Sequence, residues 1–159
     1  VVGESPVMKA LLDKARQMEE ESKKKTVAYE EAMKKVRAEA NVEREKQRAE
    51  AAKAAEALAQ RGIDVELIDL RSVKPWDRNV VYSSVGKTGR LVIADAAWMS
   101  GGIAAEIAAS VAGEIFHALK APIARVCLPD APAPTSAVLE QAYYVGAEDI
   151  VASVEKVLL

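Results

Sequence analysis

The chain of 159 residues is long enough for one ordinary domain with additional helix, and too short for two large domains. It carries 22 basic and 24 acidic residues, so its net charge of −2 provides no general attraction to nucleic acid or to an acidic membrane. The single cysteine, Cys127, excludes an internal disulfide, and the first residues contain no long apolar run. We therefore expect a soluble, cytoplasmic protein without a secretory signal or membrane span.

The composition of the chain changes near residue 50. Residues 1–50 contain twelve basic and eleven acidic side chains, which is as many charged residues as the remaining 109 contain together. No glycine lies between Gly3 and Gly62, and Pro6 is the only proline in that stretch. A segment of this kind, rich in Ala, Glu, Lys and Arg, is predicted to be helical by propensity alone.

The apolar residues of the charged segment recur at steps of three and four residues, which is typical of amphipathic helix. One helix is expected at about residues 6–24, with Ser5 as its N-cap and Pro6 at its first helical position. The sequence "ESKKKT" separates it from a second apolar stripe, for which Thr26 is the expected cap. These two stripes are predicted to close as a helical hairpin.

The charges of this segment nearly cancel. The runs "EEE" (19–21) and "KKK" (23–25) oppose each other, and residues 1–50 carry a net charge of +1. A nucleic-acid site would need one sign of charge on one face, so we expect neither nucleic acid nor a membrane as a partner. The segment is interpreted as a solvated helix face or a partner-binding coil.

From Gly62 onward the pattern alternates between strand and helix. Gly62 suits the left-handed position that ends a helix. The segments "IDVELIDL" (63–70), "RLVIADA" (90–96) and "APIARVCL" (121–128) are predicted strands, and helices are expected at about 77–85, 102–119 and 147–158. Strand, helix and strand at this spacing indicate parallel strands with right-handed crossovers. The predicted fold is a three-layer α/β/α sandwich with a charged helical hairpin before it.

The stretch "SVGKTGR" (84–90) contains Gly86-Lys87-Thr88, which is the end of a nucleotide-binding P-loop. The loop also needs a glycine five residues earlier, where this chain has Val81. A phosphate loop follows a strand and opens a helix, whereas "GKTG" closes a predicted helix and precedes a strand. We therefore interpret these residues as a helix C-cap, with Gly86 or Gly89 in the left-handed conformation.

The stretch "AWMSGGIAAEIAAS" (97–110) has the order that a ligand-binding turn needs. Ser100, Gly101 and Gly102 follow a strand and open a helix at the carboxyl end of the sheet, where open α/β folds place ligands. The full dinucleotide fingerprint is absent. An anion or ligand turn is one interpretation, and a tight turn that packs the helix on the strand is the favoured alternative.

The remaining candidate residues predict no catalytic site. His117, the only histidine, has no metal-ligand spacing around it, and Cys127 lies in a predicted strand without a base nearby. Asp95 at a strand end and Asp130 in "LPDAP" are better placed, although each could equally accept hydrogen bonds from the backbone. We predict no catalytic, cofactor-binding or metal-ligating residue in the chain.

Several motifs together resemble a known family. The segments "DLRSVKPWD", "GKTGRLV", "AW" followed by "GG", "PDAPAP" and "LEQAY" occur in this order over residues 50–159. In order and spacing they resemble the C-terminal transketolase-like domain of the beta subunit of thiamine-diphosphate-dependent 2-oxo-acid dehydrogenases. The resemblance implies a mainly parallel sheet, usually with one antiparallel edge strand.

The resemblance also implies a role in assembly. In that family the domain supports subunit pairing and docking to the acyltransferase component, while thiamine diphosphate and the reacting groups belong chiefly to other domains. We therefore expect no cofactor and no dehydrogenase activity from these 159 residues alone, and a homo-oligomer or other dehydrogenase-complex subunits as partners. Asp95, Trp98, Met99 and Asp130 are the expected interface residues.

The front of the chain departs from this family. The family domain begins with a strand that runs directly into the helix containing "AAEALAQRG", whereas here a charged, glycine-free stretch of some forty residues separates "VVGESPVM" from that helix. Residues 1–49 are interpreted as a first-strand remnant with a helical hairpin or insertion. An incomplete first strand would leave an unpaired sheet edge.

Three functions follow from these observations. The leading hypothesis is a non-catalytic assembly domain that self-associates through the sheet edge or the helical segment. The first alternative is a fragment of a 2-oxo-acid dehydrogenase that is active only with its missing domains. The second alternative is an engineered scaffold, with idealised helix joined to a natural domain.

Overall fold

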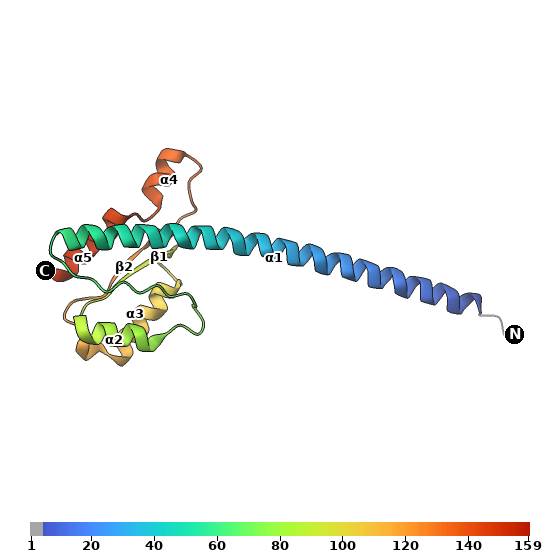
Figure 1. The fold of residues 1–159 in the computed structure, drawn as a ribbon, viewed down its shortest axis with the longest axis horizontal. Helices are drawn as coiled ribbons and strands as arrows, with labels where there is room; N and C mark the ends of the chain where they lie inside the picture. The colour runs from blue at the N-terminus through green and yellow to red at the C-terminus, as the bar shows by residue number, and fades with distance from the viewer. Residues whose placement is uncertain (1–4) are drawn as a thin grey trace. The chain divides into compact units, whose positions relative to one another are not determined.

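The computed structural model describes residues 5–159, and the chain divides into two compact units, residues 1–45 and 46–159. The strand remnant expected at the start of the chain falls largely on residues 1–4, outside the described part. The described part of the N-terminal unit is helical from Pro6 onward, and the C-terminal unit contains all the strands and the shorter helices of the described residues (Figure 1).

Helix α1 runs without interruption from Pro6 to Gln60 (Figure 1). The predicted hairpin is therefore wrong, because "ESKKKT" does not break the helix. Lys23 Nζ lies 2.6 Å from Glu19 Oε1 across one helical turn, and the Thr26 hydroxyl donates to the Ser22 carbonyl at 3.0 Å. Thr26 thus bonds back within the helix instead of capping a new one. The segment contains no glycine or proline that would force a turn.

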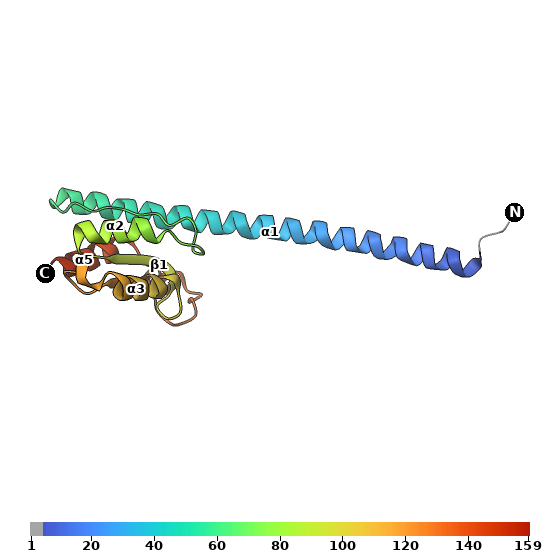
Figure 2. The same ribbon diagram turned by 90° about the horizontal axis from the view of Figure 1, so that it is seen from below.

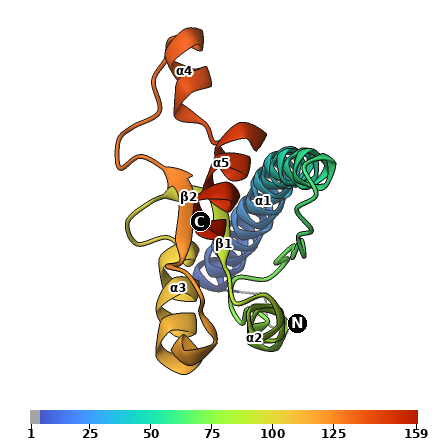
Figure 3. The same cartoon turned by 90° about the vertical axis from the view of Figure 1, so that its left-hand side faces the viewer.

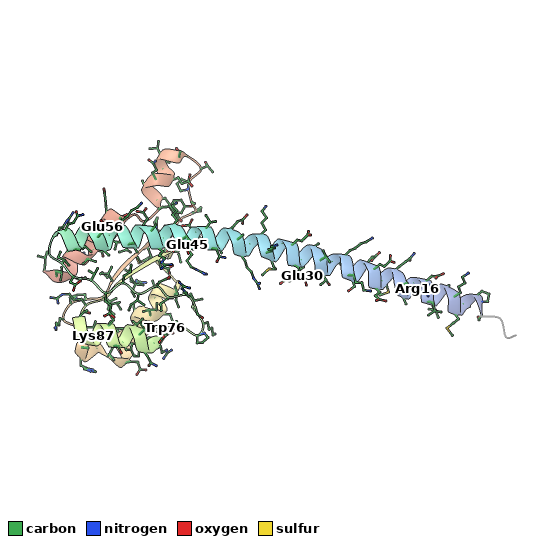
Figure 4. All side chains as sticks on the ribbon, in the orientation of Figure 1. Arg16, Glu30, Glu45, Glu56, Trp76 and Lys87 are labelled. Carbon is green, nitrogen blue, oxygen red and sulfur yellow. The ribbon has the colours of Figure 1, made fainter. Side chains whose placement is uncertain are left out.

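Residues 6–45 of α1 expose most of their side chains, including the apolar ones. Met18 is 63% exposed, Tyr29 is 66% exposed and Val36 is 56% exposed. Figure 4 shows side chains standing off every side of this part of the helix. Most of the stability of a protein helix comes from packing an apolar face, and here that face has no covering element within its own unit.

The C-terminal unit is an α/β fold built on two parallel strands. Its elements in chain order are α2 (Arg78–Thr88), β1 (Val92–Trp98), α3 (Ile103–Glu114), the 3-10 turn η1 (Phe116–Ala118), β2 (Ala124–Leu128), α4 (Ala137–Tyr143) and α5 (Ala147–Leu158). β1 and β2 pair from Val92 opposite Ala124 to Asp95 opposite Cys127, and the register shifts before Trp98. The predicted parallel sheet is confirmed.

Helices cover both faces of this sheet. Figures 1 and 3 show α5 above the two strands, with α2 and α3 below them. Figure 2 shows α3 running along β1. Buried residues of α2 and α3 form one core with Trp76, and the end of α1 forms a second core with α5, through Ala54, Leu58 and Val151.

The strand predicted at residues 63–70 is absent from the described structure. Within this segment Ile63 and Val65 pack on the second core, and Ile68 and Leu70 pack on the first. Four of the five apolar residues in this segment are therefore partly buried, whereas Leu67 is 52% exposed. A strand, however, also needs a neighbouring strand to pair with, and the sheet formed by residues 5–159 contains only β1 and β2.

No helix of residues 5–159 has both the length and the apolar composition that crossing a membrane requires.

Candidate functional site

The stretch 84–90 closes α2, as the sequence predicts. Gly89 adopts a φ of 71° and its N–H donates to the Val85 carbonyl at 2.7 Å. At the other end of the helix, the Asp77 side chain caps the Val80 N–H. Lys87 and Thr88 thus lie at the negative end of the helix dipole, which disfavours a phosphate. The interpretation as a C-cap is confirmed, with Gly89 in the left-handed conformation.

The turns that follow β1 and β2 are joined by Ser100 and Asp130. The backbone N–H of Ser100 donates to Asp130 Oδ1 at 3.0 Å, and its hydroxyl donates to Oδ2 at 2.7 Å. These two hydrogen bonds hold the pKa of the Asp130 carboxyl below its ordinary value. Because the carboxyl ends of parallel strands meet at one edge, two residues thirty positions apart come together there.

Arg125 and Met99 form a second connection at this edge. The Arg125 guanidinium donates to the Met99 carbonyl at 2.9 Å, and the Met99 N–H donates to the Leu128 carbonyl at 2.9 Å. Arg125 comes from β2, whereas Met99 directly follows β1. The end of β1 is thereby fixed to β2 after the shift in register.

Trp98 is held by a hydrogen-bond chain that reaches α4. Its indole N–H donates to the Tyr143 hydroxyl at 3.1 Å, and that hydroxyl donates to the Ala131 carbonyl at 2.7 Å. The Trp98 side chain nevertheless stays 54% exposed. A large aromatic surface is therefore both presented to solvent and fixed in orientation.

Gly101 and Gly102 form a tight turn in front of α3. Gly101 has a φ of 73°, which glycine adopts without strain. A Cβ on Gly102 would lie 3.0 Å from the Trp98 carbonyl oxygen and 3.4 Å from Asp95 Oδ2. Asp95 Oδ1 accepts from the Ala97 N–H at 3.2 Å, while its Oδ2 is buried without a hydrogen-bond partner in the described part of the chain. Gly101 thus allows the left-handed turn, and Gly102 allows the backbone to come close to β1.

An open pocket of about 370 Å³ lies over this turn. Its lining is mostly apolar and consists of Ala96, Ala97, Trp98, Ser100, Gly101, Gly102 and Leu128. Asp130 already accepts the Ser100 N–H, and a second carboxylate, Asp95, lies next to Gly102. This arrangement suits an apolar side chain of a partner better than an anion, since two carboxylates would repel negative charge.

All seven residues predicted as a ligand turn or interface lie at this edge of the sheet. Whether they bind a ligand or a partner stays a prediction. The sequence reasoning missed Arg125 and Tyr143, which position Met99 and Trp98. Tyr143 belongs to the motif "LEQAY", which indicated the family but no contact with Trp98, and Arg125 gave no signal because a lone basic residue in a strand is ordinary.

Cys127 and His117, the other titratable residues considered in the sequence, show no arrangement for catalysis or metal binding within the described residues. Burial raises the pKa of the Cys127 thiol, and the nearby Asp95 carboxylate adds to the increase, so the reactive thiolate is disfavoured. His117 is exposed in η1. Residues 5–159 contain no group of three or more His, Cys, Asp or Glu side chains that could hold a metal ion.

Comparison with known proteins identifies the family of the C-terminal unit. The family described as transketolase, C-terminal domain, matches residues 46–150. This chain belongs to that family. The match begins at Lys46, which is also where the second compact unit begins.

Its relatives include beta subunits of dehydrogenase enzymes. Acetoin:2,6-dichlorophenolindophenol oxidoreductase subunit beta from Cupriavidus necator is 44% identical over 108 residues, which cover 68% of this chain and 32% of the relative. Pyruvate dehydrogenase E1 component subunit beta-1 from Arabidopsis thaliana is 46% identical over 101 residues, which cover 64% of this chain and 28% of the relative. The chain thus spans about a third of the length of these curated relatives.

A solved structure confirms the fold. A split-gene transketolase, described as an inactive beta4 tetramer, aligns with a TM-score of 0.60 and 32% sequence identity. The alignment covers 69% of this chain and 35% of that one. The resemblance to the C-terminal domain of 2-oxo-acid dehydrogenase beta subunits is thereby confirmed.

Proposed function

We propose that this chain is a non-catalytic assembly domain that holds subunits of a 2-oxo-acid dehydrogenase type of complex together. The docking surface is the edge formed by the carboxyl ends of β1 and β2. The observation that carries the proposal is Trp98, which is half-exposed beside an open apolar pocket and fixed by its hydrogen bond to Tyr143. Trp is enriched among the few residues that supply most of the binding energy in protein interfaces.

The surroundings of Trp98 support docking of a protein. Val138 is 77% exposed and Leu139 is 59% exposed on α4, the helix that carries Tyr143. Exposed apolar side chains on the helix that holds an exposed aromatic ring are consistent with an interaction surface. Since the Trp98 ring is already held in place, docking would cost little additional conformational entropy at that residue.

The names of the relatives support a partner of the same class. Those named above are beta subunits, and the structural neighbour is a tetramer. The proposal assigns thiamine diphosphate to other domains, because the pocket beside Trp98 has the carboxylates of Asp95 and Asp130 near it, which would repel a diphosphate. In this proposal the present residues position partners and take no part in the chemical step.

The docking surface is tested by exchanging one residue. Trp98→Asp replaces the fixed ring with a charge, and Phe116→Asp, on η1, is the matched control because Phe116 is 72% exposed outside this surface. Each full-length chain is titrated with the alpha subunit and with the acyltransferase component of a bacterial acetoin-cleaving complex, and association is followed by sedimentation velocity. Association that is lost in Trp98→Asp and kept in Phe116→Asp supports the proposal. Absence of any association, or equal loss in both variants, contradicts it.

A second function is favoured by the length of the match. Because these residues match about a third of the curated relatives, we infer as the alternative that they form part of a 2-oxo-acid dehydrogenase that is active only together with its other domains. The test mixes the full chain with an alpha subunit and the preceding part of a relative's beta subunit, in the presence of thiamine diphosphate. Decarboxylation of a 2-oxo acid that depends on adding this chain supports the function. Equal rates with and without the chain contradict it.

A further inference from the structure

The exposed face of α1 before residue 46 carries a mostly apolar pattern with internal symmetry, with the polar Ser22 and Thr26 near its centre. We name this set the α1 stripe; it consists of Met8, Leu11, Ala15, Met18, Ser22, Thr26, Tyr29, Met33 and Val36. Its members stand four, seven, eleven and fourteen positions from Ser22 in both directions along the chain. The stripe thus has the same spacing whether it is followed forward or backward.

The spacing of the α1 stripe is that of a helix pair. Its eight steps cover the 28 residues from Met8 to Val36, an average of 3.5 residues per step. An apolar repeat of 3.5 residues keeps the apolar faces of two helices in contact along their length, as in a coiled coil. Leu11 is 59% exposed and Tyr29 is 66% exposed, and of the stripe only Met33 is partly buried, so most of the stripe is uncovered in the single chain.

The charges beside Ser22 are also symmetric, but with opposite sign. Residues 19–21 are all Glu, and residues 23–25 are all Lys. If a second helix ran antiparallel with its Ser22 at the same level, each acidic run would lie beside a basic run. A parallel pair in register would instead place Glu beside Glu and Lys beside Lys, which is repulsive.

We propose that two copies of this chain pair through the α1 stripe as antiparallel helices about a twofold axis at Ser22. Leu11 of one copy packs against Met33 of the other, and Ala15 packs against Tyr29. This contact is isologous: the same surface serves both copies, so the pair closes without further growth. The occupant of the exposed stripe is a second copy because the pattern is complementary to itself.

The continuous helix explains why the pairing is between chains. The two halves of the stripe could meet within one chain only if the helix turned back near Ser22. Instead α1 continues through this region, and the Thr26 hydroxyl bonds within the helix to the Ser22 carbonyl. Complementary halves that are kept apart in one chain can still meet in two chains, as in a domain swap.

This inference rests on the assembly role proposed above. It names a second copy of the chain as one partner, bound through the α1 stripe and not through the edge of the sheet. Its test uses single cysteines in full chains that also carry Cys127→Ala. A Leu11→Cys chain is mixed with a Met33→Cys chain under mild oxidation. The expected product is a disulfide-linked dimer that forms about tenfold more than in the control pair, because the thiols share a high effective concentration.

Two controls define the orientation. Gln17→Cys mixed with Val27→Cys has the same relation to Ser22 but places both thiols away from the stripe, so little linked dimer is expected. Leu11→Cys alone should also not link, because in an antiparallel pair the two residues 11 lie about 33 Å apart along the helix axis. Ser22→Cys alone should link readily.

Each other outcome overturns the inference. Linking of Leu11→Cys with itself would indicate a parallel pair, and a link within one chain of the double variant would indicate the hairpin. If no link forms while light scattering still shows an oligomer, the inference fails and the assembly role stands. If the chain is a monomer and also binds no dehydrogenase subunit, both proposals fail.

Discussion

Asp130 accepts two hydrogen bonds from Ser100, one from its backbone N–H at 3.0 Å and one from its hydroxyl at 2.7 Å. The pair joins the turn after β1 to the turn after β2, beside the exposed ring of Trp98. It therefore holds the proposed docking surface together from two segments that are thirty residues apart in the sequence.

The first prediction concerns the pH dependence of this pair. The hydrogen bonds from Ser100 lower the pKa of Asp130 in the folded state. A lowered folded pKa contributes stability that is present above the ordinary Asp pKa of about 3.9 and is lost as pH falls toward the folded value. Asp130→Asn should therefore lower the Tm at pH 7, and the difference from the parent should shrink at pH 3. Ser100→Ala, which removes the hydroxyl donor, should reduce the same pH dependence. A difference in Tm that is constant from pH 7 to pH 3 would contradict this account.

The second prediction concerns the end of α2. Gly89 has a φ of 71°, and an added Cβ would lie within 2.9 Å of the Lys120 side chain. Because Lys120 can move, the left-handed backbone causes most of the cost, and Gly89→Val should destabilise the protein by about 1–2 kcal/mol. Gly86→Ala is the matched control, since it lies inside the helix with open space around it. It should be neutral or stabilising by up to about 1 kcal/mol. Urea denaturation measures both, and equal stability of Gly89→Val and the parent would refute the prediction.

The third prediction concerns the core beneath the end of α1. Leu58 is 1% exposed and packs with Ala54 and Val151 of α5. Leu58→Ala should reduce the free energy of unfolding by about 2–5 kcal/mol, because it removes buried methyl groups and leaves a cavity. Leu67→Ala serves as the control, because Leu67 is exposed and should change stability by no more than about 0.5 kcal/mol. A similar decrease in the free energy of unfolding in the two variants would contradict the packing of α1 in this core.

The fourth prediction concerns the charges of the α1 stripe. Replacing Lys23, Lys24 and Lys25 with Glu produces two runs of three like charges on either side of Ser22 and should weaken self-association. Replacing Glu19, Glu20 and Glu21 with Lys should do the same. Mixing the two variants should restore association, because each then meets opposite charge. Sedimentation velocity at low salt measures the effect, which added salt should reduce. Unchanged association in both separate variants would contradict the pairing.

The fold could be predicted from the sequence where a local pattern alone determines the structure. The parallel strands follow from two apolar runs that flank a helix of the right length, and the helix end at Gly89 follows from glycine's conformational freedom. The hairpin was wrong because a charged run resembles a break, although Glu19 and Lys23 in fact pair across one turn of helix. The strand at 63–70 was wrong because alternation reports which residues are buried and not whether another strand is available for pairing.

The candidate site could be located but not assembled from the sequence. Residues at the ends of parallel strands meet at one edge, which places Asp95, Trp98 and Asp130 together. The hydrogen bond from Trp98 to Tyr143 spans forty-five residues and depends on the short helix α4, which is not among the helices predicted from the sequence. Contacts of this kind follow from the path of the chain, which local pattern does not determine.

The central claim is that this chain acts in assemblies, and sedimentation equilibrium of the full chain tests it most directly. One chain has a mass of 17.1 kDa. The account predicts a mass of at least two chains at micromolar concentration, which falls when the α1 stripe is disrupted by Leu11→Asp and Met33→Asp together. A single species of 17.1 kDa at every concentration, in the parent chain and in the variant alike, would contradict it.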